Sequence, residues 1–220
     1  MVATFTSLLT TIVVIFTALF PLVNPLGCAP IFLAMTPEAT AAQRKTLAGR
    51  VSRNGFFLLL GSILVGTYVL SFFGISIPIV QVGGGLVVIS TGWAMLKREH
   101  PDGREEIARS VAGDSMLRKA FYPLTLPLTV GPGSISVAVT LGANLPHPGG
   151  GRLLLALLAA VVSALLLSVC VFVCYAFADR VVRRLGPSGT SVIMRLSAFL
   201  LVCIGLQIVW NGVRALAHLP

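Results

Sequence analysis

The sequence alternates long apolar stretches with short polar ones. The apolar stretches cover residues 6–35, 55–73, 79–96, 120–141, 153–178 and 193–217. A helix needs about 17–25 mostly apolar residues to cross the hydrocarbon core of a bilayer, and each stretch is long enough to do so. The pattern predicts an all-α integral membrane protein with six transmembrane segments, in which residues 1–220 form a single membrane domain.

Two of these stretches share a proline-rich sequence. Residues 20–30 read F-P-L-V-N-P-L-G-C-A-P, and residues 122–132 read Y-P-L-T-L-P-L-T-V-G-P. An offset of 102 residues places Pro21, Pro25 and Pro30 on Pro123, Pro127 and Pro132. A proline inside a helix removes one hydrogen bond and clashes with the preceding turn. We therefore expect transmembrane segments 1 and 4 to be broken, the first between halves near residues 6–20 and 30–35.

The membrane limits where such breaks can occur. Freed backbone groups are costly in hydrocarbon, so broken backbone is tolerated only where protein covers it or where it lines a wet cavity. Breaks at corresponding places in two halves of a chain are typical of the solute site of a secondary transporter. One alternative is a pair of kinks that only serve helix packing. Another is a pair of segments that re-enter the membrane without crossing it.

The polar segments connect the apolar ones. We expect a turn at residues 36–38 and then a short surface helix, with Glu38 in its first turn, where a helix dipole favours an acid. This helix carries Arg44, Lys45, Arg50 and Arg53. Residues 74–78 are interpreted as a tight link and residues 145–151 as a flexible loop. Residues 97–119 hold six basic and five acidic residues and are interpreted as a solvated, partly helical connector between two repeats, residues 1–96 and 120–220.

Basic residues indicate the orientation in the membrane. Fourteen of the sixteen lie in or beside the joins between segments 1 and 2, 3 and 4, and 5 and 6, and only Arg152 and Arg214 lie on the other side. The positive-inside rule places the first group in the cytoplasm, so both termini are predicted to be periplasmic. Because three segments per repeat is an odd number, the two repeats are predicted to have inverted orientations.

Composition excludes several classes of protein. Hydrophobic residues make up 56% of the chain and charged residues only 10%, against about 25% charged in a soluble domain. The net charge of +9 is spread over segment ends, so no nucleic-acid partner is expected. Four cysteines lie in apolar stretches without a neighbouring histidine or carboxylate, so we expect no metal site, and we expect no cofactor. Without a basic leader or cleavage site, the first segment is expected to be retained.

Several motifs together resemble those of a known family. They are N-P-L-G-x-x-P-I-F at residues 24–32, F-G-I-S-I-P at 73–78, L-P-L-T-V-G-P-G-S-I-S at 126–136 and R-L-x-x-F-L-L-V-C-I-G-x-Q-x-x-x-N-G at 195–212. With the glycine-rich third segment, the chain is similar over essentially its whole length to the MarC family of bacterial inner-membrane proteins. That family includes SnatA-type transporters of small neutral amino acids. The resemblance implies an inner-membrane location and transport of a solute such as glycine or alanine.

The two breaks supply the candidate binding groups. A helix N-terminus presents free N–H groups suited to a carboxylate, and we expect the ammonium group of the solute to meet Asn24 and carbonyls at the broken ends. The alternative for Asn24 is a helix cap, and for each serine and threonine it is a hydrogen bond back to a carbonyl. The predicted substrate-binding residues are Asn24, Pro25, Gly27, Thr129, Gly131, Gly133 and Ser134.

The same residues constrain the mechanism. No aspartate or glutamate lies within a predicted segment, which favours a small zwitterionic solute over a cation. Coupling to protons or sodium would involve Asp179 or Glu38 at the membrane edge, or a cation held by backbone oxygens.

An intramembrane enzyme needs a nucleophile beside a base, and no histidine or lysine lies within a segment, so we expect no enzyme. A channel or an accessory membrane protein is the alternative function, because broken helices also line pores.

Overall fold

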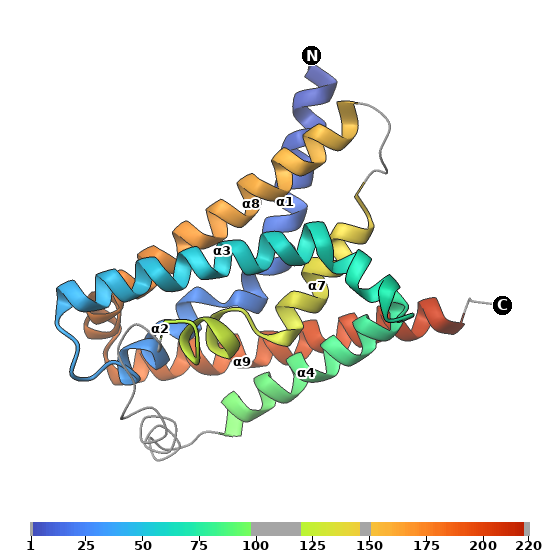
Figure 1. Ribbon diagram of the computed structural model, residues 1–220. Helices are drawn as coiled ribbons and strands as arrows, with labels where there is room; N and C mark the ends of the chain where they lie inside the picture. Colours follow the sequence, from blue (N-terminus) through green and yellow to red (C-terminus); the bar gives the residue numbers. More distant parts are fainter. Residues whose placement is uncertain (1, 98–119, 146–150, 218–220) are drawn as a thin grey trace.

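A computed structural model describes residues 2–97, 120–145 and 151–217, and the described part of the chain is helical without strands. The connector predicted at residues 97–119, apart from Lys97, and the centre of the loop predicted at 145–151 lie outside the described residues. Figure 1 shows the arrangement of the helices. Their bounds are α1 Val2–Val23, α2 Pro25–Ala34, α3 Ala41–Phe72, α4 Ile77–Lys97, the π-helix η1 Leu124–Thr129, α7 Pro132–Ala143, α8 Gly151–Ala176 and α9 Ala178–Ala217.

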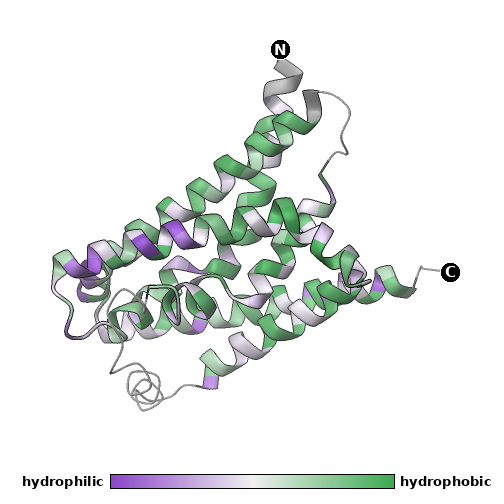
Figure 2. Ribbon diagram, viewed as in Figure 1, coloured by the Kyte–Doolittle hydropathy of each residue, from purple (hydrophilic) through white to green (hydrophobic). Residues whose placement is uncertain are grey.

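The helices have the length and composition of membrane segments. Within the described residues, five spans are long and apolar enough to cross a bilayer, and the first of them, Thr6–Ala34, includes most of α1 and all of α2. Large apolar side chains are exposed along these helices, and Figure 2 shows hydrophilic positions gathered mainly toward helix ends. A helical integral membrane protein is therefore confirmed. The predicted fourth segment contains η1 and the 12-residue helix α7, and a count of six crossings stays a prediction.

The predicted surface helix and second segment form one continuous helix. Helix α3 runs for 32 residues, because nothing between its basic start and its apolar end interrupts the backbone hydrogen bonds. Its N-cap is Thr40, whose hydroxyl accepts from the Gln43 N–H at 3.3 Å, while the Gln43 side chain accepts from the Thr40 N–H at 2.8 Å. This reciprocal capping box satisfies two free donors. The prediction that Glu38 lies in the first turn is wrong, because the cap two residues later starts the helix.

The join predicted between segments 5 and 6 is also helical. Helix α9 begins at Ala178, immediately after α8, so Arg180, Arg183 and Arg184 lie on helix and not on a loop. The helix is kinked at Gly186, which has a φ of 66° and a ψ of 178°. Glycine adopts positive φ without a steric penalty, and the following proline is well suited to the first turn of a resumed helix.

Helices α4 and α9 pack closely in antiparallel directions. A Cβ on Gly85 would lie 2.8 Å from the Gly205 carbonyl oxygen, and a Cβ on Gly205 would lie 2.9 Å from the Gly85 carbonyl oxygen. Gly92 and Gly212 are similarly close to backbone oxygens of Ala198 and Pro78. Small residues let membrane helices approach until their backbones touch. The glycine-rich third segment therefore serves close helix packing, as its sequence indicates.

An ion pair joins two helix ends beside the short helix α2. The Arg44 guanidinium near the start of α3 contacts Asp179 in the first turn of α9, and its Nε donates to the Thr36 carbonyl oxygen at 3.2 Å. The Thr36 hydroxyl donates in turn to the Phe32 carbonyl oxygen at 2.9 Å. The start of α3 and the α8–α9 junction therefore lie at one end of the molecule, opposite the turn between α3 and α4 (Figure 1).

Candidate functional site

The first break consists of a single residue. Helix α1 continues through Pro21 to Val23, and α2 resumes at Pro25. Only Asn24 leaves the helical conformation, with a left-handed φ of 45° and ψ of 58°. Among residues other than glycine, asparagine enters this region relatively easily. The break is therefore narrower than the sequence predicts, because Pro25 occupies the first turn of a helix, where no N–H is required.

The side chain of Asn24 caps the resumed helix. Its Oδ1 accepts from the Gly27 N–H at 3.1 Å, as in the capping alternative. A Cβ on Gly27 would lie 2.4 Å from Asn24 Nδ2, so this glycine leaves room for the cap. The amide nitrogen is different, because Asn24 is 8% exposed and its Nδ2 has no hydrogen-bond partner in the described structure. A buried donor without a partner is unusual and needs an explanation.

The second break has a different local structure. It begins with η1, in which Thr125 and Thr129 donate from their hydroxyls to carbonyls five residues earlier, at 2.6 and 2.7 Å. Leu126 within η1 has non-helical dihedral angles, and the peptide bonds before Pro123 and Pro127 are cis. Helix α7 then starts at Pro132, with Gly131 as an N-cap that provides no side-chain hydrogen bond. The N-terminus of α7 therefore presents backbone N–H groups beside the break.

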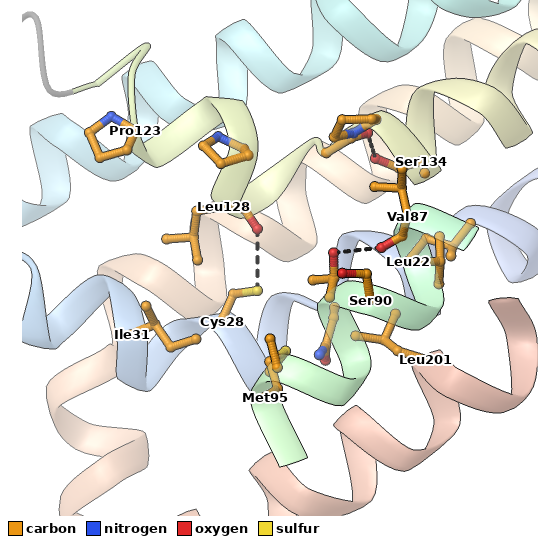
Figure 3. A pocket seen from close by; sticks show the side chains of 18 of the residues that line it. Leu22, Cys28, Ile31, Val87, Ser90, Met95, Pro123, Leu128, Ser134 and Leu201 are labelled. Carbon is orange, nitrogen blue, oxygen red and sulfur yellow. Dashed lines mark hydrogen bonds between the residues drawn. The ribbon is translucent and has the colours of Figure 1, made fainter. Parts of the chain in front are cut away.

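The two breaks approach each other and enclose one side of a cavity. The Cys28 thiol of α2 lies 3.5 Å from the Leu128 carbonyl oxygen of η1. Beside this contact is a cavity of about 370 Å³, which Figure 3 shows between α2, η1, the start of α7 and α4. Its lining comes from both breaks, from α4 and from one residue of α9. The residues are Leu22, Asn24, Cys28, Ile31, Met35, Val87, Val88, Ser90, Thr91, Ala94, Met95, Pro123, Pro127, Leu128, Gly131, Pro132, Gly133, Ser134 and Leu201.

Four of the seven residues predicted to bind substrate line this cavity, namely Asn24, Gly131, Gly133 and Ser134. Gly133 also has a packing role, since a Cβ there would lie 2.1 Å from Val88 Cγ2. Pro25, Gly27 and Thr129 are not among the lining residues. Pro25 starts α2, Gly27 leaves room for the cap, and the Thr129 hydroxyl lies 2.9 Å from that of Tyr175.

Sequence reasoning missed the contribution of α4. Val87, Ser90, Thr91, Ala94 and Met95 of this helix form much of the wall that faces the two breaks. The available signal was the Ser90-Thr91 pair, two neighbouring polar residues in a stretch whose other polar side chain is Gln81. The glycines of this segment were interpreted as a helix-packing surface, and its polar pair was not considered as part of the site.

Two of the three hydroxyl groups of the cavity wall, those of Ser134 and Thr91, are already donors within the protein. Ser134 Oγ donates to the Gly131 carbonyl oxygen at 2.8 Å, and Thr91 Oγ1 donates to the Val87 carbonyl oxygen at 2.8 Å. Each hydroxyl has one hydrogen, so toward a ligand these oxygens are acceptors. Among the described residues, none that lines the cavity is charged, and none belongs to a cluster of potential metal ligands.

Comparisons with known proteins show similarity to bacterial membrane proteins. The family described as "MarC family integral membrane protein" matches residues 9–217. The chain is 31% identical over 200 residues to the inner membrane protein MarC of Salmonella typhimurium, covering 89% of this chain and 90% of that protein. It is 29% identical over 204 residues to the membrane protein YhcE of Escherichia coli, covering 91% of each. No solved structure gives a significant match.

Proposed function

The chain belongs to the MarC family of integral membrane proteins, and on this premise we propose that it is a secondary transporter of a small neutral amino acid. The observation that carries the proposal is the cavity between the two helix breaks, which is lined by Asn24, whose amide nitrogen has no hydrogen-bond partner among the described residues. Broken helices at the interface of two halves provide backbone groups for a solute without any charged side chain. Such a cavity suits a zwitterion.

Transport is favoured over catalysis by the chemistry of the cavity wall. Its polar groups among the described residues are an amide, three hydroxyls, a thiol and backbone atoms, and within this described lining no side chain is a histidine, a lysine or a carboxylate that could act as a general base. Coupling to a proton or sodium gradient would then use Asp179, which is paired with Arg44 at one end of the molecule, or a cation bound by backbone oxygens. The proposed location is the bacterial inner membrane.

The proposal includes six crossings in two inverted repeats. Its support is the reciprocal contact of Gly85 with the Gly205 carbonyl and of Gly205 with the Gly85 carbonyl. A reciprocal antiparallel contact is what a two-fold axis between the third segments of two repeats would produce. Helix α1 packs on α8, and α7 packs on α3, so each first segment contacts the second segment of the other repeat.

The proposed orientation has both termini in the periplasm. Arg44 and Asp179 bring two basic segments, the start of α3 and the start of α9, to the same end of the molecule, as the positive-inside rule requires. We expect a periplasm-dependent reporter fused after Pro220 to be active and a cytoplasm-dependent reporter at the same site to be silent. Fusions within residues 98–119 are the matched control and should give the opposite result. Activity of the cytoplasmic reporter after Pro220 would refute this orientation.

Uptake into proteoliposomes tests the transport function. Purified protein is reconstituted and offered a panel of labelled neutral amino acids, with and without imposed proton and sodium gradients. We expect saturable uptake of at least one neutral amino acid, with competition among similar solutes. Flux that rises linearly without saturation would support the channel alternative, and equal flux in protein-free vesicles would contradict transport altogether.

A further inference from the structure

We infer that the carboxylate of the solute is bound by the Asn24 amide, and that its side chain is larger than the methyl group of alanine. This inference rests on the proposed transport function and specifies the substrate of the same cavity. It has two independent supports. One is the donor and acceptor arrangement of the cavity wall, and the other is the size and apolar character of that wall.

The orientation follows from the hydrogen bond that Asn24 already makes. Its Oδ1 is used by the Gly27 N–H, so only the NH₂ group remains, and this group can donate but not accept. Less than 1 Å² of Nδ2 is exposed, so an acceptor reaches it after a small rotation of the amide or opening of the break. A carboxylate oxygen is an acceptor that can satisfy this donor.

The acceptor lies elsewhere in the wall. Thr91 Oγ1 of α4 uses its hydrogen on the Val87 carbonyl oxygen, so its lone pairs can receive an ammonium group. Ser134 Oγ also donates to a carbonyl oxygen, but Ser134 lies in the first turn of α7, where the helix dipole disfavours a cation. The cavity therefore has a donor at Asn24 and an acceptor for the ammonium group at Thr91 of α4. This orientation is the reverse of the one expected from the sequence, which places the ammonium at Asn24.

The size of the cavity indicates the side chain. Its volume of about 370 Å³ equals the share of roughly a dozen water molecules at about 30 Å³ each, so glycine or alanine fills only part of it. The wall away from Asn24 is apolar, with Ile31, Met35, Val87, Met95 and Leu201. Transfer of each additional methylene to such a wall improves affinity by about fourfold. An aliphatic or thioether side chain of the size of leucine or methionine fits this space.

Competition with chemical analogues tests the orientation in the unmodified protein. Uptake of labelled leucine is measured in the presence of unlabelled leucine, of leucinamide, which lacks the carboxylate, and of 4-methylpentanoate, which lacks the ammonium. We expect leucine to compete best and leucinamide to compete at least tenfold less well than 4-methylpentanoate. Leucinamide that competes as well as leucine would overturn the assignment of Asn24 to the carboxylate.

The variant Asn24→Asp gives a test with an opposite sign for each orientation. Aspartate keeps the cap oxygen and replaces the donor with a second carboxylate oxygen. If Asn24 binds the carboxylate, leucine should bind at least tenfold more weakly and leucinamide should gain. Tighter binding of leucine would place the ammonium there and refute the inference. Elution of the variant as a monodisperse species in detergent shows that it folds. If the variant does not fold, the competition with analogues in the unmodified protein tests the orientation alone.

A homologous series tests the size of the side chain. We expect the Km to fall from glycine through alanine and valine to leucine and methionine. The variant Ala94→Leu, which adds bulk to the cavity wall, should raise the Km for leucine more than that for alanine. Gly83→Leu is the matched control on the same helix, because a Cβ at Gly83 meets nothing within 4 Å, and it should leave the leucine-to-alanine ratio unchanged. A preference for glycine and alanine would refute the inference while leaving the transport proposal standing, whereas uptake of no amino acid would remove both.

Discussion

Replacement of Gly142 by alanine is expected to prevent α7 from packing on α3. A Cβ at this position would lie 1.9 Å from the Ile63 carbonyl oxygen and 2.8 Å from the carbonyl carbon. Backbone cannot rotate away as a flexible side chain can, so the two helices must separate. Overpacking typically costs about 1–3 kcal/mol, and a backbone collision belongs at the upper end or beyond it. Gly66 on α3 adds to this seam, since a Cβ there would lie 2.3 Å from Val139 Cγ2.

The effect should be measurable as a loss of thermal stability in detergent. A change of about 3 kcal/mol corresponds to roughly 6–12 °C in a chain of this size. Gly61→Ala on α3 is the matched control, because a Cβ at Gly61 meets nothing within 4 Å and alanine is the better helix former. We expect Gly61→Ala to unfold at the parental temperature or slightly above it. Equal melting temperatures for Gly142→Ala and the parent would contradict the packing of α7 on α3.

Apolar length was a reliable guide to the helices. The predicted stretches at residues 79–96 and 153–178 differ by two residues or fewer at each end from α4 at Ile77–Lys97 and α8 at Gly151–Ala176. The reason is physical, because a long apolar run must satisfy its backbone internally in a membrane. The polar starts of α3 and α9 were not predicted as parts of these long helices. These polar starts contain no proline except Pro187, the helices continue through Gly49 and Gly189, and polarity alone does not end a helix.

The candidate site was only partly predictable. Repeated prolines located both breaks to within a few residues, but they could not identify Asn24 as the single residue that leaves the helix, since Pro21 and Pro30 lie within helices. The hydrogen bonds made by the side chains of the site could not be predicted either. The Gly27 N–H donates to Asn24 Oδ1, and the Thr91 and Ser134 hydroxyls donate to backbone carbonyl oxygens. These hydrogen bonds depend on local backbone geometry, which the spacing of residues in the sequence does not specify.

Tyr175 illustrates a contact that the repeat pattern conceals. The offset of 102 residues pairs it with Phe73, yet Phe73 is 68% exposed and Tyr175 is fully buried. Its ring stacks on Phe32 of α2 with the ring centres 4.5 Å apart. Because the Thr129 hydroxyl donates to the Leu124 carbonyl oxygen, the Tyr175 hydroxyl is the donor in its 2.9 Å contact with Thr129. One side chain of α8 therefore contacts both α2, which follows the first break, and η1, with which the second break begins.

The variants Tyr175→Ala and Tyr175→Phe separate the two parts of this contact. Truncation to alanine removes the stacked ring and leaves a cavity between α2 and η1, a change that costs about 3–5 kcal/mol in packed interiors. Phenylalanine keeps the stacking and removes one hydrogen bond, worth about 0.5–1.5 kcal/mol net. We expect Tyr175→Ala to lose most of the thermal stability in detergent and all solute uptake, and Tyr175→Phe to retain most of both.

Comparison of solute uptake by the two variants shows whether the ring or the hydroxyl of Tyr175 positions the breaks. If the stacked ring sets the separation of α2 and η1, Tyr175→Phe should keep uptake and Tyr175→Ala should lose it. In both variants the Thr129 hydroxyl still donates to the Leu124 carbonyl oxygen. If the Tyr175 hydroxyl sets this separation, Tyr175→Phe should resemble Tyr175→Ala in uptake while remaining stable. Phe32→Leu is the complementary change, because it removes the other ring and leaves the Tyr175–Thr129 hydrogen bond in place. Uptake and stability equal to the parent in all three variants would show that α8 does not determine the geometry of the breaks.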